Sequence, residues 1–224
     1  MVYPHRQGDI VMWPDCRLPD LFGIEVPIIQ APMAGANGSA MAVAASGAGA
    51  LGSLPCAMLD AARICSEIGV IRQQTSKPIN VNFFCHTPSD PDPERDAAWK
   101  AALAGYYAEI GLDTSASAPA PSRAPFDETT CENVEDLKPA VVSFHFGLPV
   151  KALLRRAKEA GAVVISSATT VEEARWLVDQ GCDAIIAQGY RRAATAACSW
   201  ATTSLPRPAP WRWCLRWSTR STCP

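Results

Sequence analysis

Residues 140–188 read AVVSFHFGLP VKALLRRAKE AGAVVISSAT TVEEARWLVD QGCDAIIAQ, and they carry the clearest structural pattern in the chain. Short apolar runs alternate here with segments whose apolar residues recur at helical spacing. We predict strands at about 140–146, 162–168 and 184–188, and helices at about 150–160 and 171–179, the second with Thr170 as its N-cap. Strands separated by helices of this length pair in parallel, so the stretch predicts consecutive β-α-β units of an α/β protein.

The same alternation continues toward the N-terminus. Strands are expected at about 27–33, 50–54 and 79–84, and helices at about 39–47 and 58–74. Six strands with five crossovers fit either a doubly wound sheet or an incomplete (β/α)8 TIM barrel with about six of its eight strands. Since no GxGxxG follows any expected strand, the dinucleotide fingerprint is absent and the TIM barrel is favoured.

An acidic, Pro-rich segment at about 86–138 interrupts this pattern and is expected to be an insertion. It includes a predicted helix at about 93–110, with an apolar stripe formed by Trp99, Leu103, Tyr106 and Ile110. We expect the stripe to dock the helix on the body of the protein; a lid over the active site is the alternative.

Composition bounds the class of protein. The 224 residues are 48% hydrophobic and 19% charged, with a net charge of −2, which excludes a disordered chain and a disulfide miniprotein. Nine cysteines, an odd number without CxxC or zinc spacing, predict reduced thiols, no metal and a cytoplasmic location. The uncharged run at 26–59 is broken by Pro and Gly, and the first twenty residues lack the apolar core of a signal peptide, so we expect no membrane partner. Nor is a nucleic-acid partner expected.

Active sites of parallel barrels lie at the carboxyl ends of the strands. The residues expected there are mostly uncharged: Gln30–Gly35, Asn82, His145, Ser166–Thr169 and Gln188–Gly189. Strand alternation places Asn80 and Asn82 on one face. Backbone amides, carboxamides and one imidazole suit a flat heteroaromatic cofactor that is hydrogen-bonded at its edge.

Among the three histidines, His145 is the one inside an expected strand, flanked by Phe144 and Phe146. Apolar surroundings lower the pKa of an imidazole and let it accept a proton near neutrality, as a general base must. The alternative is a histidine of the core whose hydrogen bonds are satisfied and whose role is only structural. His5 and His86 lie in polar, loop-like contexts and are expected to be solvated.

Five ordered blocks of the sequence resemble the nitronate monooxygenases, formerly called 2-nitropropane dioxygenases, over roughly residues 18–189. The blocks are Pro27-Ile-Ile-Gln-Ala-Pro-Met-Ala-Gly35, Gly49-Ala-Leu-Gly-Ser53, Asn80-Val-Asn-Phe-Phe84, Val142-Ser-Phe-His-Phe-Gly-Leu-Pro149 and Ser167-Ala-Thr-Thr-Val-Glu-Glu-Ala174. The resemblance implies that residues 1–189 are the FMN-binding portion of a TIM barrel. It also implies a flavin oxidoreductase that oxidises alkyl nitronates with O2 to carbonyl compounds and nitrite.

The resemblance further implies roles for six residues. His145 is the expected catalytic base or anion-stabilising residue, Asn82 and Gln188 hydrogen-bond the FMN, and the flavin is lined by Ala31, Pro32 and Met33. Two alternatives remain. One is an FMN-dependent enoyl-acyl carrier protein reductase, against which the block Phe144–Pro149 argues; the other is a truncated product without catalytic function.

The last 35 residues differ from the rest. Residues 190–224 contain six Arg and four of the seven Trp but no Asp or Glu, so residues 1–189 carry a net charge of −8. Where the family continues Glu-Ala-Gly-Gly-His-Arg-Gly after the strand ending in Gln-Gly, this chain has Tyr190-Arg-Arg-Ala-Ala-Thr-Ala. If one base was lost after the codon for Tyr190, the other reading frame can encode the family segment. Because Trp has a single codon, that frame then requires a Gly at the position now occupied by Ala201.

We therefore predict that the segment 190–224 is translated out of frame and has no native fold; a genuine basic tail is the alternative. Barrels of this kind hold the cofactor phosphate in loops after strands seven and eight. A chain without those loops is expected to bind FMN poorly, to have impaired activity and to aggregate through open strand edges.

Overall fold

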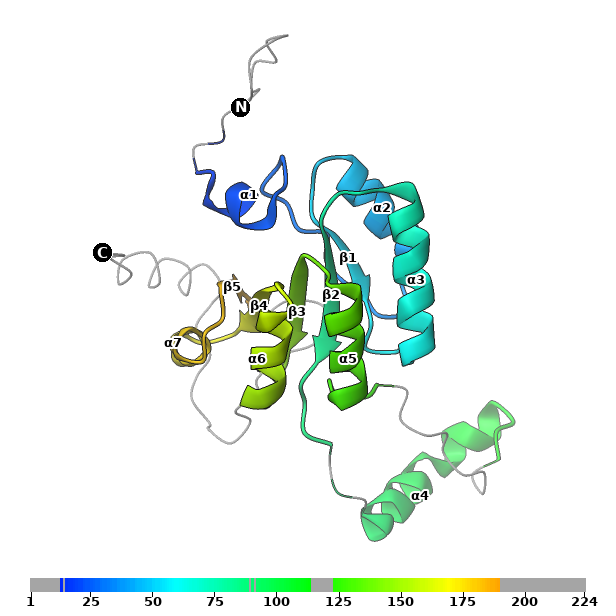
Figure 1. Cartoon of the computed structure of the whole chain (residues 1–224). Helices are drawn as coiled ribbons and strands as arrows, with labels where there is room; N and C mark the ends of the chain where they lie inside the picture. The colour runs from blue at the N-terminus through cyan, green and yellow to red at the C-terminus, as the bar shows by residue number, and fades with distance from the viewer. Residues whose placement is uncertain (1–12, 14, 89, 91, 114–122, 190–224) are drawn as a thin grey trace, which may run out of the picture.

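The computed structural model describes residues 13, 15–88, 90, 92–113 and 123–189 (Figure 1). At the centre of this part of the chain lies a sheet with its strands in sequence order: β1 Gly52–Pro55, β2 Ile79–Phe84, β3 Val141–His145, β4 Val163–Ala168 and β5 Ala184–Ala187. Each neighbouring pair is parallel. The predicted α/β class is confirmed, and the sequential strand order is that of a barrel, because a doubly wound sheet reverses its order at a switch point.

The expected strand at 27–33 is wrong: it is reduced to one isolated bridge, between Ile29 and Leu51. The Gln30 N–H donates to the Leu51 carbonyl at 2.9 Å. Pro27 and Pro32 have no N–H to donate on either side of this contact, so the ladder does not extend. The described sheet therefore has five strands where six were expected, and it is open rather than closed.

Helices connect the strands, and most lie where the periodicity predicted them. The connecting helices are α2 Ser39–Gly47, α3 Ala61–Gln74, α5 Glu128–Leu137, α6 Lys151–Glu159 and α7 Val171–Asp179, with α1 Arg17–Phe22 before them and α4 Pro93–Glu109 between β2 and α5. The predicted cap is confirmed, because the Thr170 side chain accepts a hydrogen bond from the Glu173 N–H. Figure 1 shows α3, α5 and α6 side by side on one face of the sheet.

Alternation along the strands divides the sheet into two faces. The helix-facing side is apolar, and it packs against Ile64, Ile68 and Leu154 of α3 and α6 through Leu54, Val81, Phe83, Val142, Phe144 and Val164. The opposite face has a smaller apolar cluster formed by Phe22, Ile24, Leu51, Val141 and Ile165. Beyond this cluster, toward the carboxyl ends of the strands, the same face becomes polar.

Helix α5 was not expected; it lies within the segment 86–138 that the sequence marked as an insertion. Asp127 and Thr130 form a capping box at its start. The Arg156 guanidinium of α6 binds the Glu135 carboxylate through two hydrogen bonds of 2.6 and 2.7 Å and also contacts Glu128. This guanidinium lowers the pKa of Glu135 below its ordinary value. Thus α5 belongs to the outer helical layer, and only the part of the segment before it departs from the barrel pattern.

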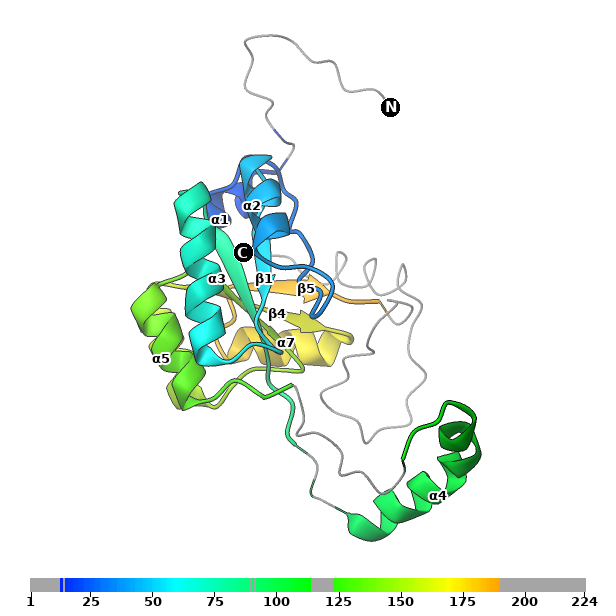
Figure 2. The ribbon, with the colours of Figure 1, turned by 90° about the vertical axis from the view of Figure 1, so that its right-hand side faces the viewer.

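Docking of the α4 stripe is not observed. None of the residues of α4 is buried, and Trp99 is 67% exposed and Tyr106 68% exposed. In both views the helix lies apart from the sheet and its covering helices (Figures 1 and 2). The helix-facing side of the sheet is already covered by α3, α5 and α6, so it offers no apolar surface to a further helix.

Among the described residues, no helix is both long enough and apolar enough to cross a membrane. The predicted out-of-frame segment 190–224 lies outside the described residues, as does His5.

Close contact between α2 and β1 makes Gly52 the most demanding position in the sheet. A Cβ atom on Gly52 would lie 2.1 Å from the Ala42 carbonyl oxygen and 2.5 Å from Ser46 Oγ. We expect Gly52→Ala to lower the free energy of unfolding by about 3 kcal/mol, because backbone and helix must shift. The matched control is Gly69→Ala, within α3, where a Cβ meets nothing within 4 Å and the change should stabilise by about 0.5–1 kcal/mol. Urea denaturation followed by circular dichroism compares the two, and equal stabilities would contradict the packing described.

Candidate active site

A pocket of about 650 Å³ opens at the carboxyl ends of the strands. It is the place where the polar half of the inner sheet face meets the loop that follows the Ile29 bridge. All six residues singled out in the sequence line it: Ala31, Pro32, Met33, Asn82, His145 and Gln188. The structure thus brings the predicted set together in one hollow, while the role of each residue stays a prediction.

Two carboxamides project from β2 into this pocket. Asn82 lies opposite Ser143 in the parallel register, and its Nδ2 donates to the Ser143 carbonyl at 3.2 Å and to the Ser143 hydroxyl at 2.9 Å. Both N–H bonds of Asn82 are thereby used, so the atom that this amide offers a ligand is its Oδ1 acceptor.

Asn80 lies two residues before Asn82 on the same face of β2, deeper in the sheet, and it is 1% exposed. Its Nδ2 donates to Ser53 Oγ at 3.0 Å, but its Oδ1 is buried and has no hydrogen-bond partner among the described residues. Leaving a buried acceptor unsatisfied costs about 1–3 kcal/mol. Asn82 therefore keeps an acceptor that fits a ligand edge carrying an N–H group, as the flavin expected from the sequence does, while the unsatisfied Asn80 acceptor lies buried beneath it.

The loop that forms one wall of the pocket is fixed by two side-chain amides, one at a position expected near the active site and one, Asn37, that the sequence analysis did not single out. Gln30 accepts from the Ser53 N–H at 2.8 Å and donates to the Ala31 carbonyl at 2.5 Å. Asn37 accepts from the Met33 N–H at 2.6 Å and donates to the Ser53 carbonyl at 3.3 Å. These bonds hold Ala31 and Met33 against β1, so the apolar wall is preformed.

His145 is the last residue of β3 and is half-buried at the pocket. Its Nδ1 lies 2.8 Å from the Ser167 hydroxyl oxygen of β4, a partner that the sequence analysis did not identify. The expected flanking by Phe144 and Phe146 is half wrong. Phe144 points to the helix side, where it is 1% exposed and packs on Phe126, because neighbouring strand residues face opposite ways.

The aromatic neighbours of the His145 ring are Phe146, with ring centres 4.3 Å apart, and Phe84, at 5.8 Å. His86, expected to be solvated, keeps part of its surface exposed, but it does so at the pocket. His86 is half-buried, lines the pocket, and has its ring 6.2 Å from Phe84 and 6.1 Å from Phe146. A signal was present in the sequence, since His86 lies two residues after Phe84, the last residue of β2.

The two ends of the inserted segment meet at the same pocket. Phe84 forms an isolated bridge with Pro125, and the Phe126 N–H donates to the Phe84 carbonyl at 2.7 Å. This pairing brings the exposed Arg123 to the lining of the pocket, which also includes His86. Among the described lining residues, Arg123 carries the one side chain that is fully charged at neutral pH, so the pocket favours neutral or anionic ligands over cations.

Thiols near the pocket are poor nucleophiles. Burial raises the pKa of Cys56 to about 12 and also raises that of Cys85, which follows Phe84 in the chain. Both thiols therefore stay protonated at neutral pH, and the reactive form is the thiolate. The described residues contain no cluster of three His, Cys, Asp or Glu side chains able to hold a metal ion.

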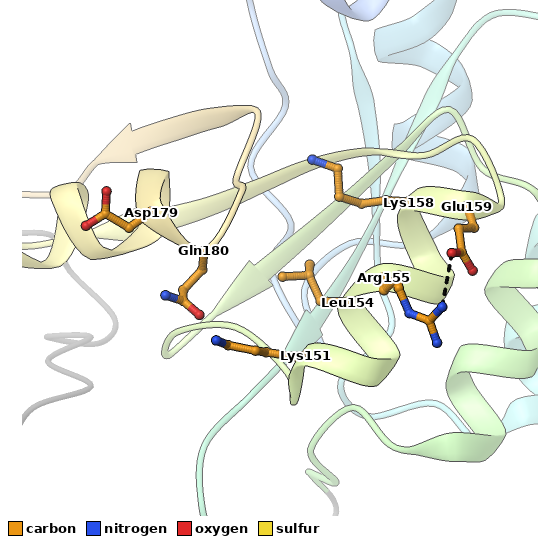
Figure 3. A pocket seen from close by; sticks show the side chains of 7 residues that line it. All are labelled: Lys151, Leu154, Arg155, Lys158, Glu159, Asp179 and Gln180. Carbon is orange, nitrogen blue, oxygen red and sulfur yellow. Dashed lines mark hydrogen bonds and ion pairs between the residues drawn. The ribbon is translucent and has the colours of Figure 1, made fainter.

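A second hollow of about 490 Å³ lies between α6 and α7 (Figure 3). Three of the charged side chains that line it form ion pairs: Arg155 pairs with Glu159 at 3.4 Å, and Lys158 pairs with Asp183 at 2.8 Å. This hollow has no strand-end residue, so the pocket of the carboxyl ends is the candidate active site.

The open parallel sheet and this strand-end pocket define part of an α/β-barrel enzyme. A sequence profile of the nitronate monooxygenase family matches residues 16–195, and the chain belongs to that family. It is 40% identical over 178 residues to the nitronate monooxygenase of Pseudomonas aeruginosa, covering 77% of this chain and 50% of the relative. The Paraburkholderia phytofirmans nitronate monooxygenase is 39% identical, with 75% and 46% covered. The resemblance seen in the five sequence blocks is confirmed.

Solved structures agree with this assignment. The nitroalkane oxidase from Streptomyces ansochromogenes superposes with a TM-score of 0.67 at 35% identity, covering 77% of this chain and 48% of that chain. FabK from Thermotoga maritima superposes with a TM-score of 0.55 at 26% identity, with 77% and 43% covered. The chain spans about half the length of the curated relatives it matches.

Proposed function

We propose that the pocket binds FMN and that the protein oxidises alkyl nitronates with O2 to carbonyl compounds and nitrite. One observation carries the proposal: in a chain of the nitronate monooxygenase family, His145 is held by Ser167 in the same pocket as the acceptors of Asn80 and Asn82. An imidazole can handle a proton or a negative charge, and neutral carboxamides can hydrogen-bond the flavin, as this reaction requires.

The residues present fit a flavin ring. Its edge carries one N–H between two carbonyl groups, and the Asn82 carboxamide at the pocket keeps its Oδ1 as an acceptor, because its Nδ2 donates to Ser143. Ala31, Pro32 and Met33 supply an apolar wall for the ring face. When bound, FMN supplies the two-electron oxidation and the reaction with O2; the chain supplies binding, orientation and proton handling.

His145 has two ways to act on this substrate class. A nitronate is an anion with its charge on two oxygens, and a protonated imidazole stabilises that charge. A neutral imidazole instead accepts the α-proton when a neutral nitroalkane is the substrate. Arg123 at the rim adds a positive potential that attracts an anion without occupying the floor of the pocket.

An FMN-dependent enoyl-acyl carrier protein reductase is the second candidate. The match to the nitronate monooxygenase profile and the 39–40% identity to named nitronate monooxygenases support the first candidate over it. NAD(P)H consumption with an enoyl thioester, in place of nitrite release, identifies the second.

We also propose that residues 1–189 are the FMN-binding portion and that this portion needs further barrel strands for full activity. The described residues supply five strands, whereas a barrel holds the cofactor phosphate after strands seven and eight. The family match stops at residue 195, close to the change of composition after Tyr190. This closeness supports a change of frame at that point.

The nucleotide sequence tests the frame. With one base restored after the codon for Tyr190, we expect Glu-Ala-Gly-Gly-His-Arg-Gly to follow and the open frame to continue well beyond 224 codons. The frame-restored protein should be yellow and monodisperse, and the chain as it stands should bind FMN weakly. If no one-base change at this point opens a longer frame, the proposal of an out-of-frame segment fails.

Catalysis by His145 is tested in the frame-restored protein by nitrite release from a propyl nitronate in air. His145→Gln should lower kcat/KM by about 100-fold or more, because loss of one group that stabilises the charge of the reacting anion costs roughly that much, while FMN affinity stays within about threefold. Lys151→Gln, in the hollow between α6 and α7, is the matched control and should retain full activity. Nitrite release by His145→Gln at the rate of the unchanged protein would remove His145 from the chemistry.

FMN binding by the carboxamides is tested by fluorescence titration. Asn82→Leu and Asn80→Leu each replace a carboxamide with an apolar side chain of similar size. Loss of one buried hydrogen bond is expected to raise the Kd for FMN about tenfold. The variant with the larger loss identifies the acceptor that meets the ring N–H. If neither change alters the Kd, the amides do not hold the cofactor.

A further inference from the structure

The backbone turns sharply where β3 ends at the pocket. Phe144 faces the helices and His145 faces the pocket, so an unbroken strand would return the next side chain to the helix side. Phe146 instead has a φ of +67°, and Gly147 follows with a φ of +100°. As a result the Phe146 ring lies on the pocket side, against His145, Phe84 and His86.

A positive φ is unusual for a bulky residue and strains its backbone. Two non-glycine residues in the described part of the chain have one: Lys138, which occupies the left-handed C-cap of α5, and Phe146. Lys138 is at a common position for this conformation. Phe146 directly follows a strand, and a glycine at this position would adopt the same backbone without strain. The strain therefore indicates that the phenyl ring itself has a role here.

The surrounding structure holds the strained turn in place. The Ser166 hydroxyl, fully buried on β4, lies 3.1 Å from the Phe144 carbonyl oxygen and 2.9 Å from the Gly147 carbonyl oxygen. It therefore bridges the two sides of the His145–Phe146 turn. The His145 carbonyl in turn accepts from the Cys85 N–H at 2.8 Å. These bonds fix the backbone on both sides of Phe146, so the ring position is imposed.

The imposed ring completes the surroundings of the imidazole. The Ser167 hydroxyl holds one nitrogen of the imidazole, and since the second side-chain torsion of histidine has broad minima, packing against the ring faces also decides its orientation. Phe146, with its ring tilted by 58° and its centre 4.3 Å away, blocks rotation of the imidazole, and Phe84 lies tilted by 46° at 5.8 Å.

We propose that Phe146 is a positioning residue, whose strained backbone carries its ring into the pocket to hold the His145 imidazole on Ser167 in one orientation and one tautomer. The inference deepens the proposed function and rests on it for the role of His145, but the geometry it describes exists without flavin or substrate. Ser166 supports the turn from behind and acts through Phe146.

The orientation of His145 is measured by nitrogen-15 NMR of the imidazoles in the full chain at pH 8, without added flavin. His145→Gln assigns the signals. We expect the two ring nitrogens of His145 to be well separated in shift, as in one tautomer, and Phe146→Ala to reduce that separation by about half as the ring becomes free to exchange. Phe146→Leu, which keeps an apolar wall, should retain most of it. Trp99→Ala, on the exposed face of α4, is the control and should change nothing.

Strain is measured separately by unfolding. Glycine normally destabilises relative to alanine, but at this position Phe146→Gly should have a folding equilibrium constant at least about fivefold larger than Phe146→Ala. Ser166→Ala keeps the Phe146 side chain and removes its support, so it should reproduce part of the spectral change of Phe146→Ala. It provides the test if Phe146→Ala does not fold.

Unchanged His145 shifts in folded Phe146→Ala, or in folded Ser166→Ala and Phe146→Leu together, would overturn the inference. So would a glycine variant less stable than the alanine variant. Since these spectra need neither FMN nor a nitronate, a protein that releases no nitrite but shows the expected shifts would contradict the proposed function and leave the positioning role standing.

Discussion

The alternation of side chains along the parallel strands determines both where the core forms and where the pocket lies. Each strand turns every second residue toward the helices and the others toward the inner face. On the helix side this places Val81, Phe83 and Phe144 in one apolar layer that α3, α5 and α6 cover. The same alternation gathers Asn82 and His145 on the opposite face, although 62 residues separate them in the chain. The same alternation therefore forms the core on one face of the sheet and the pocket on the other.

The inner face changes character along its depth. Its amino-terminal half is closed by apolar side chains that include Leu51 and Ile165, while its carboxyl half carries short polar groups that bond to each other across strands. Asn82 on Ser143 and His145 on Ser167 repeat one arrangement: a longer polar side chain is fixed by a hydroxyl from the next strand. Such pairs hold the pocket groups before any ligand arrives, which is the preorganisation that binding and catalysis require.

Sequence periodicity predicted the strands and helices well where the pattern is local. The expected range of β2 agrees with the structure residue by residue, and the Thr170 cap was read from one side chain. Helix α5 was missed because an acidic, Pro-rich composition masked its Asp127 capping box. The direction of the Phe146 ring was not predictable, because it depends on a left-handed backbone held by a buried serine of another strand. Likewise, the exposure of α4 depends on which surfaces its neighbours have already covered.

The pairing of Phe84 with Pro125 has a consequence for how this protein can diversify. The chain leaves the sheet after Phe84 and returns beside it, so the intervening segment begins and ends at one place on the barrel rim. The entropic cost of closing a loop grows only slowly with the length of the loop. Evolution can therefore lengthen, shorten or replace this segment while the strands keep their register, and each exchange alters the rim of the pocket through His86 and Arg123 without disturbing its floor.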